Sequence, residues 1–339
     1  MSLDQTGNGQ IEAEYMTVGG KLAVVFGGSG FVGRHTVSAL AKRGFRVRAA
    51  VRRPDLAGFL QPMGVVGQVQ AVQANFRYPD SVARAVAGAD VVITSVGVLA
   101  PSGAQTFEAV HVDGPRAVAK AARAAGVPRL IHISAIGASE KSNSRYAQSK
   151  AAGEKAVLQV FPDAVILRPS IVFGPEDEFF NRFASLARFS PFMPLIGLGS
   201  TKFQPVYVGD LATAIANAAE GSGNSGTVYE IGGPEKLSFR ALLDATLTYT
   251  GRKRPFLLMP FWLAKLQALA TWPLPNSMRP LTVDQVRLLK TDNVVSDAAV
   301  REGRTIQNLG VPDPAPVSAI VPGYLERFNP KGQYAHYRT

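Results

Sequence analysis

A glycine-rich turn near the start of the chain carries its clearest chemical signal. The turn reads GGSGFVG over residues 27–33, after an apolar run and before a segment whose apolar residues have helical spacing. Glycine is needed where the backbone turns sharply and lets a pyrophosphate approach, and the helix that follows offers its free N–H groups and positive dipole end to that anion. The pattern therefore predicts a dinucleotide-binding site.

Two arginines, Arg52 and Arg53, end the next predicted strand, and no acidic residue stands at its tip. An Asp or Glu there would accept a hydrogen bond from a bare ribose 2′-hydroxyl, whereas arginine suits a 2′-phosphate through charge-assisted bonds. The alternative is that both side chains are ordinary solvated surface. We take the first interpretation, which predicts a preference for NADP(H) over NAD(H).

The composition excludes several other kinds of site. The chain has 339 residues, of which 46% are hydrophobic, enough for one large domain or two coupled ones. It contains no cysteine, so disulfides, thiolate metal sites and cysteine nucleophiles are excluded. Its four histidines are scattered without ligand-like spacing, so we expect no metal site.

The charge balance indicates what kind of partner the chain has. A formal net charge of +11 favours nucleotide phosphates, acidic lipid headgroups or an acidic protein surface as the binding partner. Lys and Arg are spread along the chain without a nucleic-acid-binding motif, so we expect no nucleic-acid partner.

No targeting or membrane-spanning segment is predicted. The first 20 residues contain acidic side chains and no apolar core, unlike a secretory signal or an organelle presequence. No stretch of the chain approaches the ~18 apolar residues of a membrane span. We expect a cytosolic protein or one on a cytosol-facing surface.

Strand and helix patterns alternate along the first half of the chain. Strands are predicted at 22–26, 45–51, 68–72, 90–95, 129–134 and 164–167, and helices at 31–42, 80–87, 106–125 and 144–160. This alternation predicts an α/β fold with a doubly wound parallel sheet of the Rossmann type. The ligand crevice of such a sheet lies at the carboxyl ends of the strands.

The predicted organisation has two folded parts. We expect a flexible lead-in (1–18), a dinucleotide-binding domain (19–230), a smaller C-terminal lobe over the crevice (231–330) and a tail (331–339). An excursion at about 171–205 is expected to contribute to the lobe. A helix at about 211–219 and a strand at 227–230 are expected to return to the main sheet.

Several further motifs match one protein superfamily. They are NF at 75–76, SVG at 95–97, YAQSK at 146–150 and LRPSIVFGP at 167–175. Together with the glycine turn, they resemble the short-chain dehydrogenase/reductase superfamily, of the extended or atypical type. More narrowly, SRY at 144–146, GEK at 153–155, GPED at 174–177, FNRFA at 180–184 and QPVYV at 204–208 resemble the NADPH-binding accessory subunits of respiratory complex I. The likeness extends over about 19–320.

The resemblance implies a set of nucleotide contacts along the crevice. Gly27, Ser29, Gly30, Phe31 and Gly33 would cradle the pyrophosphate, Arg52 and Arg53 would hold the 2′-phosphate, Asn75 and Phe76 would bracket the adenine, and Ser95, Val96 and Gly97 would line the adenosine ribose. Tyr146 and Lys150 would bond the nicotinamide ribose beside Ser134, with Pro169 and Ser170 near the carboxamide. The implied cofactor is NADP(H), held tightly as NADPH.

Catalysis in this superfamily uses a tyrosine as general acid/base and a lysine four residues later, which lowers the pKa of the tyrosine. That spacing puts both side chains on one face of a helix. Tyr146 and Lys150 keep the spacing, and Ser134 would be the nearby hydroxyl if the chain were an enzyme.

Two departures from the superfamily pattern concern turnover. The substrate-orienting hydroxyl expected one or two residues after Ser134 is Ala135 or Ile136, and losing one such donor costs roughly 10²–10³ in rate. His111 stands where the superfamily has asparagine, and we interpret it as a satisfied helix residue. We therefore expect no catalytic residue, only retained nucleotide binding.

Basic and apolar aromatic residues are interspersed over about 255–290, and the helical part of this segment, about 261–271, is too short to cross a bilayer. Such a segment suits a membrane interface or a protein groove. Alternatively, it is the lid of a substrate pocket, with its apolar face inward. The resemblance favours docking to other subunits of respiratory complex I, with peripheral contact to the membrane surface.

Two hypotheses follow. The first is a non-catalytic NADPH-binding accessory subunit that stabilises respiratory complex I near its membrane and quinone end. Its location would be the cytoplasmic face of the bacterial inner membrane, or the matrix side of the mitochondrial inner membrane in an organelle. The second is an NADP-dependent reductase, epimerase or dehydratase of the extended type that uses Tyr146 and Lys150.

Overall fold

The computed structural model describes residues 20–271 and 281–330. The predicted lead-in (1–18), the predicted tail (331–339) and part of the basic segment (272–280) lie outside the described residues.

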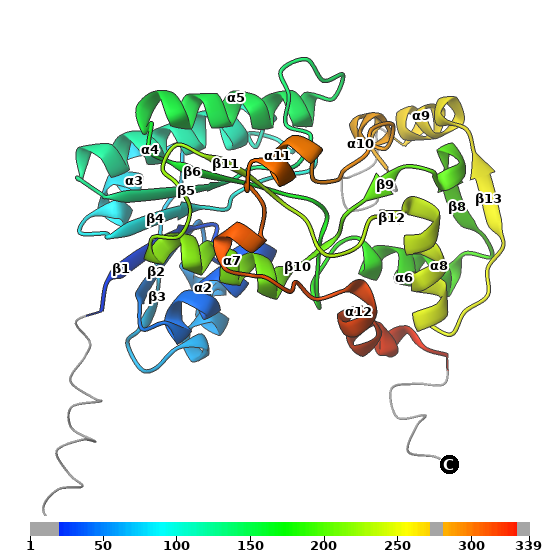
Figure 1. Cartoon of the computed structure of the whole chain (residues 1–339), viewed down its shortest axis with the longest axis horizontal. Helices are drawn as coiled ribbons and strands as arrows, with labels where there is room; N and C mark the ends of the chain where they lie inside the picture. The colour runs from blue at the N-terminus through cyan, green and yellow to red at the C-terminus, as the bar shows by residue number, and fades with distance from the viewer. Residues whose placement is uncertain (1–19, 272–280, 331–339) are drawn as a thin grey trace, which may run out of the picture.

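The chain is built around a seven-stranded, wholly parallel sheet (Figure 1). Its strands are β1 (Leu22–Phe26), β2 (Arg46–Val51), β3 (Val69–Gln73), β4 (Val91–Thr94), β5 (Arg129–Ile133), β6 (Val165–Pro169) and β11 (Val228–Ile231), in the order β11-β6-β5-β4-β1-β2-β3. The prediction of a doubly wound parallel sheet is confirmed. The strand order reverses between β1 and β4, which is where such sheets bind nucleotides.

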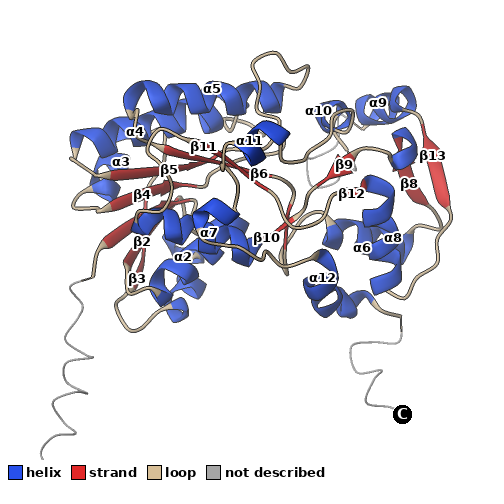
Figure 2. Cartoon of the chain, viewed as in Figure 1, coloured by secondary structure: helices blue, strands red, loops and turns tan. Residues whose placement is uncertain are grey.

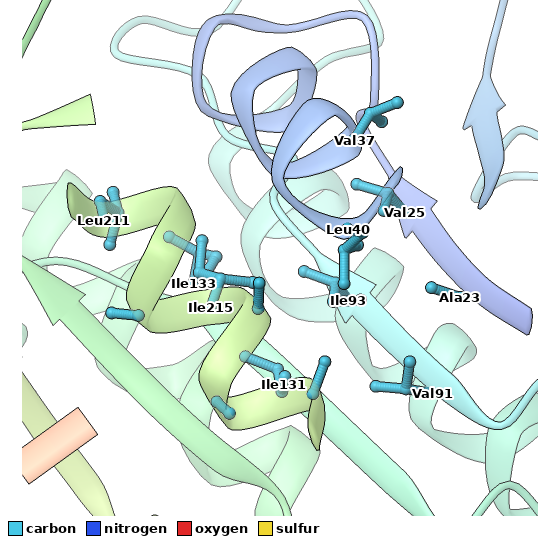
Figure 3. Close-up of a cluster of buried hydrophobic side chains, with 14 of the residues drawn as sticks. Ala23, Val25, Val37, Leu40, Val91, Ile93, Ile131, Ile133, Leu211 and Ile215 are labelled. Atoms are coloured by element: carbon cyan, nitrogen blue, oxygen red, sulfur yellow. The ribbon is translucent and has the colours of Figure 1, made fainter. Parts of the chain in front are cut away.

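Helices cover both faces of this sheet (Figure 2). One face carries α2 (Phe31–Lys42) and α7 (Val208–Glu220), and the other carries α3 (Pro79–Val86), α4 (Gly114–Ala124) and α5 (Arg145–Val160). The strands are apolar on both sides because both faces are buried. Figure 3 shows the first of these layers, where Val37 and Leu40 of α2 pack with Val25 and Ile93 of the sheet.

The helix predicted at 106–125 is not one regular helix. Its first part, Glu108–Asp113, is a π-helix (η3), and α4 follows it. A π-helix widens the backbone by one residue and turns its side chains relative to a regular helix. The π-helix lies where the backbone of η3 approaches α5 closely, since a Cβ on Gly153 of α5 would lie 2.0 Å from the carbonyl oxygen of His111.

A second hydrophobic core lies beside the sheet, among elements drawn from two stretches of the chain (Figures 1 and 2). The first stretch supplies β7 (Val172–Phe173), α6 (Phe180–Phe189), β8 (Met193–Ile196), β9 (Lys202–Phe203) and β10 (Val206–Tyr207). The second supplies β12 (Leu237–Ser238), α8 (Phe239–Tyr249), β13 (Phe256–Met259), α9 (Phe261–Ala270), α10 (Val283–Leu288) and α12 (Val317–Leu325). We call this part the lobe. Phenylalanine rings from both stretches pack edge to face at its centre.

Part of the segment predicted as lobe lies against the sheet instead. After α10 the chain crosses back through α11 (Asp297–Arg301) and a 3-10 turn (Gln307–Leu309), and Ile306, Leu309 and Val311 join the core under α7. These apolar residues cover the sheet beside β11, so the chain links lobe and sheet more than once.

Candidate functional site

The glycine turn has the backbone that a pyrophosphate site requires. Gly27 has a φ of +82°, a left-handed conformation that favours glycine. A Cβ on Gly33 would lie 2.0 Å from the carbonyl oxygen of Gly27, and one on Gly28 would lie 2.8 Å from the Ala49 Cβ. Among the described residues, no side chain caps the first turn of α2 and no acid lies in it. A free, positively polarised helix end thus faces a turn whose only side chain before the helix is that of Ser29, which fits a dinucleotide pyrophosphate.

Residues after β4 lie directly beside this turn, at the point where the strand order reverses. The Ser95 hydroxyl donates a hydrogen bond of 2.8 Å to the carbonyl oxygen of Phe26. A Cβ on Gly27 would meet the Val96 Cγ2 at 3.0 Å. Ser95 and Val96 therefore pack directly against the glycine turn, and Gly97, which follows them, is exposed.

The two arginines after β2 are both exposed but differ in their partners. Arg53 donates a hydrogen bond of 2.8 Å to Asp55, which raises the arginine pKa and lowers the pKa of the carboxyl. Within residues 20–271 and 281–330, Arg52 makes no ion pair. Arg52 is thus the cation that is free to meet a phosphate. Asp55, only two residues after Arg53, is a partner that the sequence prediction did not include.

Asn75 and Phe76 lie at the carboxyl end of β3. The side-chain oxygen of Asn75 accepts a hydrogen bond of 3.1 Å from the Arg77 N–H, which shapes the turn into α3. The Phe76 ring lies 5.8 Å from the Phe26 ring, centroid to centroid, and a Cβ on Gly114 would lie 2.1 Å from Phe76. The ring is therefore fixed beside the end of β1.

Tyr146 and Lys150 lie on one face of α5, as their spacing predicts. The Lys150 ammonium donates a hydrogen bond of 3.2 Å to the carbonyl oxygen of Ile133 and lies 5.9 Å from the centre of the Tyr146 ring. Burial lowers the pKa of Lys150 to about 8 and raises the pKa of Tyr146 to about 12. At neutral pH the phenol is therefore protonated in the nucleotide-free protein.

His111 is a neutral, fully bonded residue of the π-helix. Its Nε2 accepts a hydrogen bond of 3.1 Å from the Val98 N–H, so its proton is on Nδ1, which donates to the Ser149 hydroxyl at 2.8 Å. Burial, helped by the charge of Lys150, lowers its pKa to about 3. Its ring packs edge-on against Tyr146 at 5.4 Å. His111 therefore packs against the tyrosine ring, while its single ring proton is donated to Ser149.

The end of β5 lacks an available hydroxyl. The Ser134 hydroxyl is buried and has no hydrogen-bond partner within the described part of the chain. Ile136 is buried against Val295 and Ala299, and neither Ile136 nor Ala135, the two positions where the superfamily resemblance implies a donor, carries a hydroxyl.

Pro169 and Ser170 end β6, and a residue from beyond α10 ties this end down. The Ser170 hydroxyl donates to the Asn293 side-chain oxygen at 2.7 Å, and the Asn293 amide donates to the carbonyl oxygen of Ile136 at 3.2 Å. Asn293 thus bridges the ends of β5 and β6 at the predicted nicotinamide end. Nothing in its sequence surroundings indicated this role.

Asp284 of α10 is a second residue that sequence reasoning missed. Its carboxylate accepts hydrogen bonds from the Ser144 hydroxyl at 2.7 Å, from the Arg145 N–H at 2.8 Å and from the Tyr146 N–H at 3.0 Å. It is the single acid among the many basic residues of 251–290, which was the available signal.

Six large apolar side chains of β13 and α9 are exposed to solvent, and we call this set the apolar ledge. Its members are Leu257, Leu258, Trp262, Leu263, Leu266 and Leu269, and Trp262 is 67% exposed. The helix α9 buries only the small Ala264 and Ala268. A lid over a pocket would have the opposite orientation, so the ledge favours docking. In the part of the chain that the structure describes, no helix is long and apolar enough to span a bilayer.

Comparisons with known proteins agree with this geometry. Residues 27–177 match the NAD(P)H-binding family model, so this part of the chain is a nicotinamide-dinucleotide-binding domain, and residues 138–233 match the 3-beta hydroxysteroid dehydrogenase/isomerase family. The mitochondrial NADH dehydrogenase (ubiquinone) 1 alpha subcomplex subunit 9 of Arabidopsis thaliana is 37% identical, over 84% of this chain and 73% of that protein.

Two further likenesses are to enzymes. The ceramide reductase of Caulobacter vibrioides is 37% identical, over 57% of this chain and 59% of that protein. The structure of an NADPH-dependent quinone oxidoreductase from Escherichia coli, complexed with NADPH, has a TM-score of 0.69 at 19% identity, covering 88% of this chain and 97% of that one. The last likeness shows the fold alone.

Proposed function

This chain belongs to the family of the NADH dehydrogenase (ubiquinone) 1 alpha subcomplex subunit 9 proteins, and from that premise we propose that it is a non-catalytic, NADPH-holding accessory subunit of a respiratory complex I. The observation that carries the proposal is the 37% identity over most of both chains. The retained nucleotide crevice and the apolar ledge support it.

The nucleotide would lie along the crevice with its phosphates at the glycine turn. The free N–H groups of α2 would bind the pyrophosphate, and Arg52, with Arg53, would bind a 2′-phosphate, so that NADPH is preferred over NADH. Lys150 and Tyr146 would bond the nicotinamide ribose, since their side chains share one face of α5. When bound, the dinucleotide supplies a nicotinamide that can carry a hydride.

The nicotinamide end favours holding the nucleotide over using it. Neither Ala135 nor Ile136 offers a hydroxyl to a substrate carbonyl, and the Ser134 hydroxyl is buried. Asn293 occupies the hydrogen-bonding groups of Ser170 and Ile136. A tightly held nucleotide would stabilise the folded chain by mass action, which is a sufficient role for a ligand that is never consumed.

Docking through the lobe accounts for the apolar ledge. Large apolar side chains left in water favour burial against a partner, and Lys265 and Lys290 beside them favour an acidic surface or lipid headgroups. We place the chain peripherally at the membrane and quinone end of the assembly. The side would be the cytoplasmic face of a bacterial inner membrane, or the matrix side in a mitochondrion.

Two observations favour the alternative that the chain is an enzyme. Tyr146 and Lys150 retain their spacing, and the partial likeness to a ceramide reductase reaches 37% identity. An NADP-dependent reductase would need Tyr146 as a proton donor to a carbonyl.

Native mass spectrometry of gently solubilised membranes tests the proposal. We expect the chain to co-migrate with a large NADH:quinone oxidoreductase at fixed stoichiometry and to carry one NADPH. Leu266→Glu should release the chain from the complex. Val300→Glu, which changes an equally exposed apolar residue on α11, should not release it. A free soluble protein that oxidises NADPH, and loses this turnover in Tyr146→Phe, would establish the enzyme instead.

A further inference from the structure

The N-terminus of α5 is held by the lobe. Ser144 caps this helix in the usual way, since its hydroxyl oxygen accepts a hydrogen bond from the Ala147 N–H at 3.3 Å. That leaves the first two helical N–H groups, those of Arg145 and Tyr146, without intrahelical partners. The Asp284 carboxylate accepts both, at 2.8 and 3.0 Å.

The contact is electrostatically well matched. A carboxylate at the positive end of a helix dipole forms charge-assisted hydrogen bonds, which are about twice as strong as neutral ones. The Ser144 hydroxyl adds a third bond to the same carboxylate at 2.7 Å. Only Arg287, 3.8 Å away, competes for Asp284 among the cations with a described ion pair.

Asp284 is itself rigidly positioned within the lobe. It lies in the first turn of α10, whose start is fixed by a capping box between Thr282 and Gln285. Helix α10 packs against α9, the helix that carries most of the apolar ledge (Figure 1). The carboxylate therefore connects the helix of Tyr146 and Lys150 to the surface proposed for docking.

A second attachment lies on the other side of the nicotinamide end. Residues after α10 run to Asn293, which bonds Ser170 and Ile136. The segment from Leu281 to Asn293 is thus tied at α5 and at the ends of β5 and β6. A shift of α5 would have to move α10 or break three hydrogen bonds.

We propose that Asp284 is a positioning residue of the nucleotide site and that it couples nucleotide binding to the apolar ledge. NADPH bound to Tyr146 and Lys150 holds the start of α5 in place, and Asp284 carries that order to α10 and α9. Because such coupling is reciprocal, docking of the ledge raises the affinity of the chain for the nucleotide. The inference deepens the proposed function, because it rests on binding of NADPH in this crevice.

Hydrogen exchange on the full-length chain, with and without NADPH, tests the coupling. In the wild type, NADPH should slow amide exchange in 261–270. Asp284→Asn should abolish that slowing and lower the affinity for NADPH about tenfold, which is toward the lower end of the factors by which coupled sites change each other's affinity. Asp297→Asn, an exposed first-turn acid on α11, should change neither quantity.

A second variant guards against misfolding. Ser144→Ala removes the hydroxyl donor from the α5 side and should reduce the slowing in the same direction, with a smaller loss of affinity. If Asp284→Asn lowers thermal stability but keeps wild-type NADPH affinity and exchange, the residue is merely structural and the inference is overturned. If the wild-type chain binds no NADPH at all, the proposed function itself fails, which is a different result.

Discussion

Replacing Arg52 with alanine should shift the coenzyme preference from NADPH toward NADH, and by more than replacing Arg53. Both side chains are exposed at the end of β2. Arg53 already donates to Asp55 at 2.8 Å, so a 2′-phosphate would have to compete with a carboxylate for it. Arg52 has no such competitor among the described ion pairs.

The size of the effect follows from the exposure of the site. A hydrogen bond to a charged group contributes roughly 1.5–3 kcal/mol when it is shielded, and solvent screening reduces this at a surface. We therefore expect Arg52→Ala to lower the affinity for NADPH about tenfold and Arg53→Ala to lower it only about threefold. Asp55→Asn, which releases Arg53, should tighten NADPH by a similar small factor.

Nicotinamide fluorescence titrations with NADPH and with NADH measure both affinities on the same protein. NADH affinity should stay within about twofold in all three variants, because NADH lacks the 2′-phosphate. Arg43→Ala, at the opposite end of α2 from the glycine turn, is the control. Equal losses for both coenzymes in Arg52→Ala, or a larger loss in Arg53→Ala, would refute the assignment of the phosphate to Arg52.

Three further predictions concern stability. The unfolded chain keeps the Lys150 proton up to its ordinary pKa of 10.5, whereas the folded chain releases it near 8. The free energy of unfolding of the nucleotide-free protein should therefore rise between pH 8 and 10.5, by roughly 3 kcal/mol, and urea titrations of Lys150→Met should lack this rise. Gly153→Ala places a Cβ 2.0 Å from a backbone oxygen of η3 and should cost about 3 kcal/mol in urea unfolding, whereas Gly58→Ala, with open space around it, should stay within about 0.5 kcal/mol. Glu154→Gln breaks a buried two-bond ion pair with Arg168, and calorimetry should show a loss of about 2 kcal/mol. That is below the ~3–5 kcal/mol of a fully buried pair, because the Arg168 side chain is 24% exposed; an unchanged midpoint would contradict it.

The first strand, the glycine turn and α2 could be predicted from the sequence because every local signal there agrees. An apolar run, a turn that only glycine fits and helical spacing of apolar residues all indicate one structure, and α2 begins and ends at the predicted residues, Phe31 and Lys42. Strands buried on both faces were equally visible, since short Val- and Ile-rich runs recur between helical segments. Their ends differ from prediction by a residue or two, as hydrogen-bond pairing decides them.

The features that could not be predicted all depend on contacts between distant residues. The π-helix reads as regular helix in the sequence, and its widening becomes visible only where η3 meets Gly153 of α5. Asp284 and Asn293 meet the site across sequence separations of about 140 and 123 residues. Composition marked Asp284 as unusual, but only the fold shows that its charge neutralises a helix end.

The two halves of the crevice differ in a way that bears on function. The adenosine and pyrophosphate half keeps the glycine turn, and its charged phosphates can accept charge-assisted hydrogen bonds, which are about twice as strong as neutral ones. The departures that bear on turnover lie at the nicotinamide half, where Ala135 and Ile136 carry no hydroxyl and the Ser170 hydroxyl bonds to Asn293. A chain under selection for turnover needs the second half, since transition-state hydrogen bonds are made there. A chain that only holds its nucleotide needs the adenosine and pyrophosphate half. Lobe residues that hydrogen-bond within the nicotinamide half, as Asn293 does, make that half more rigid.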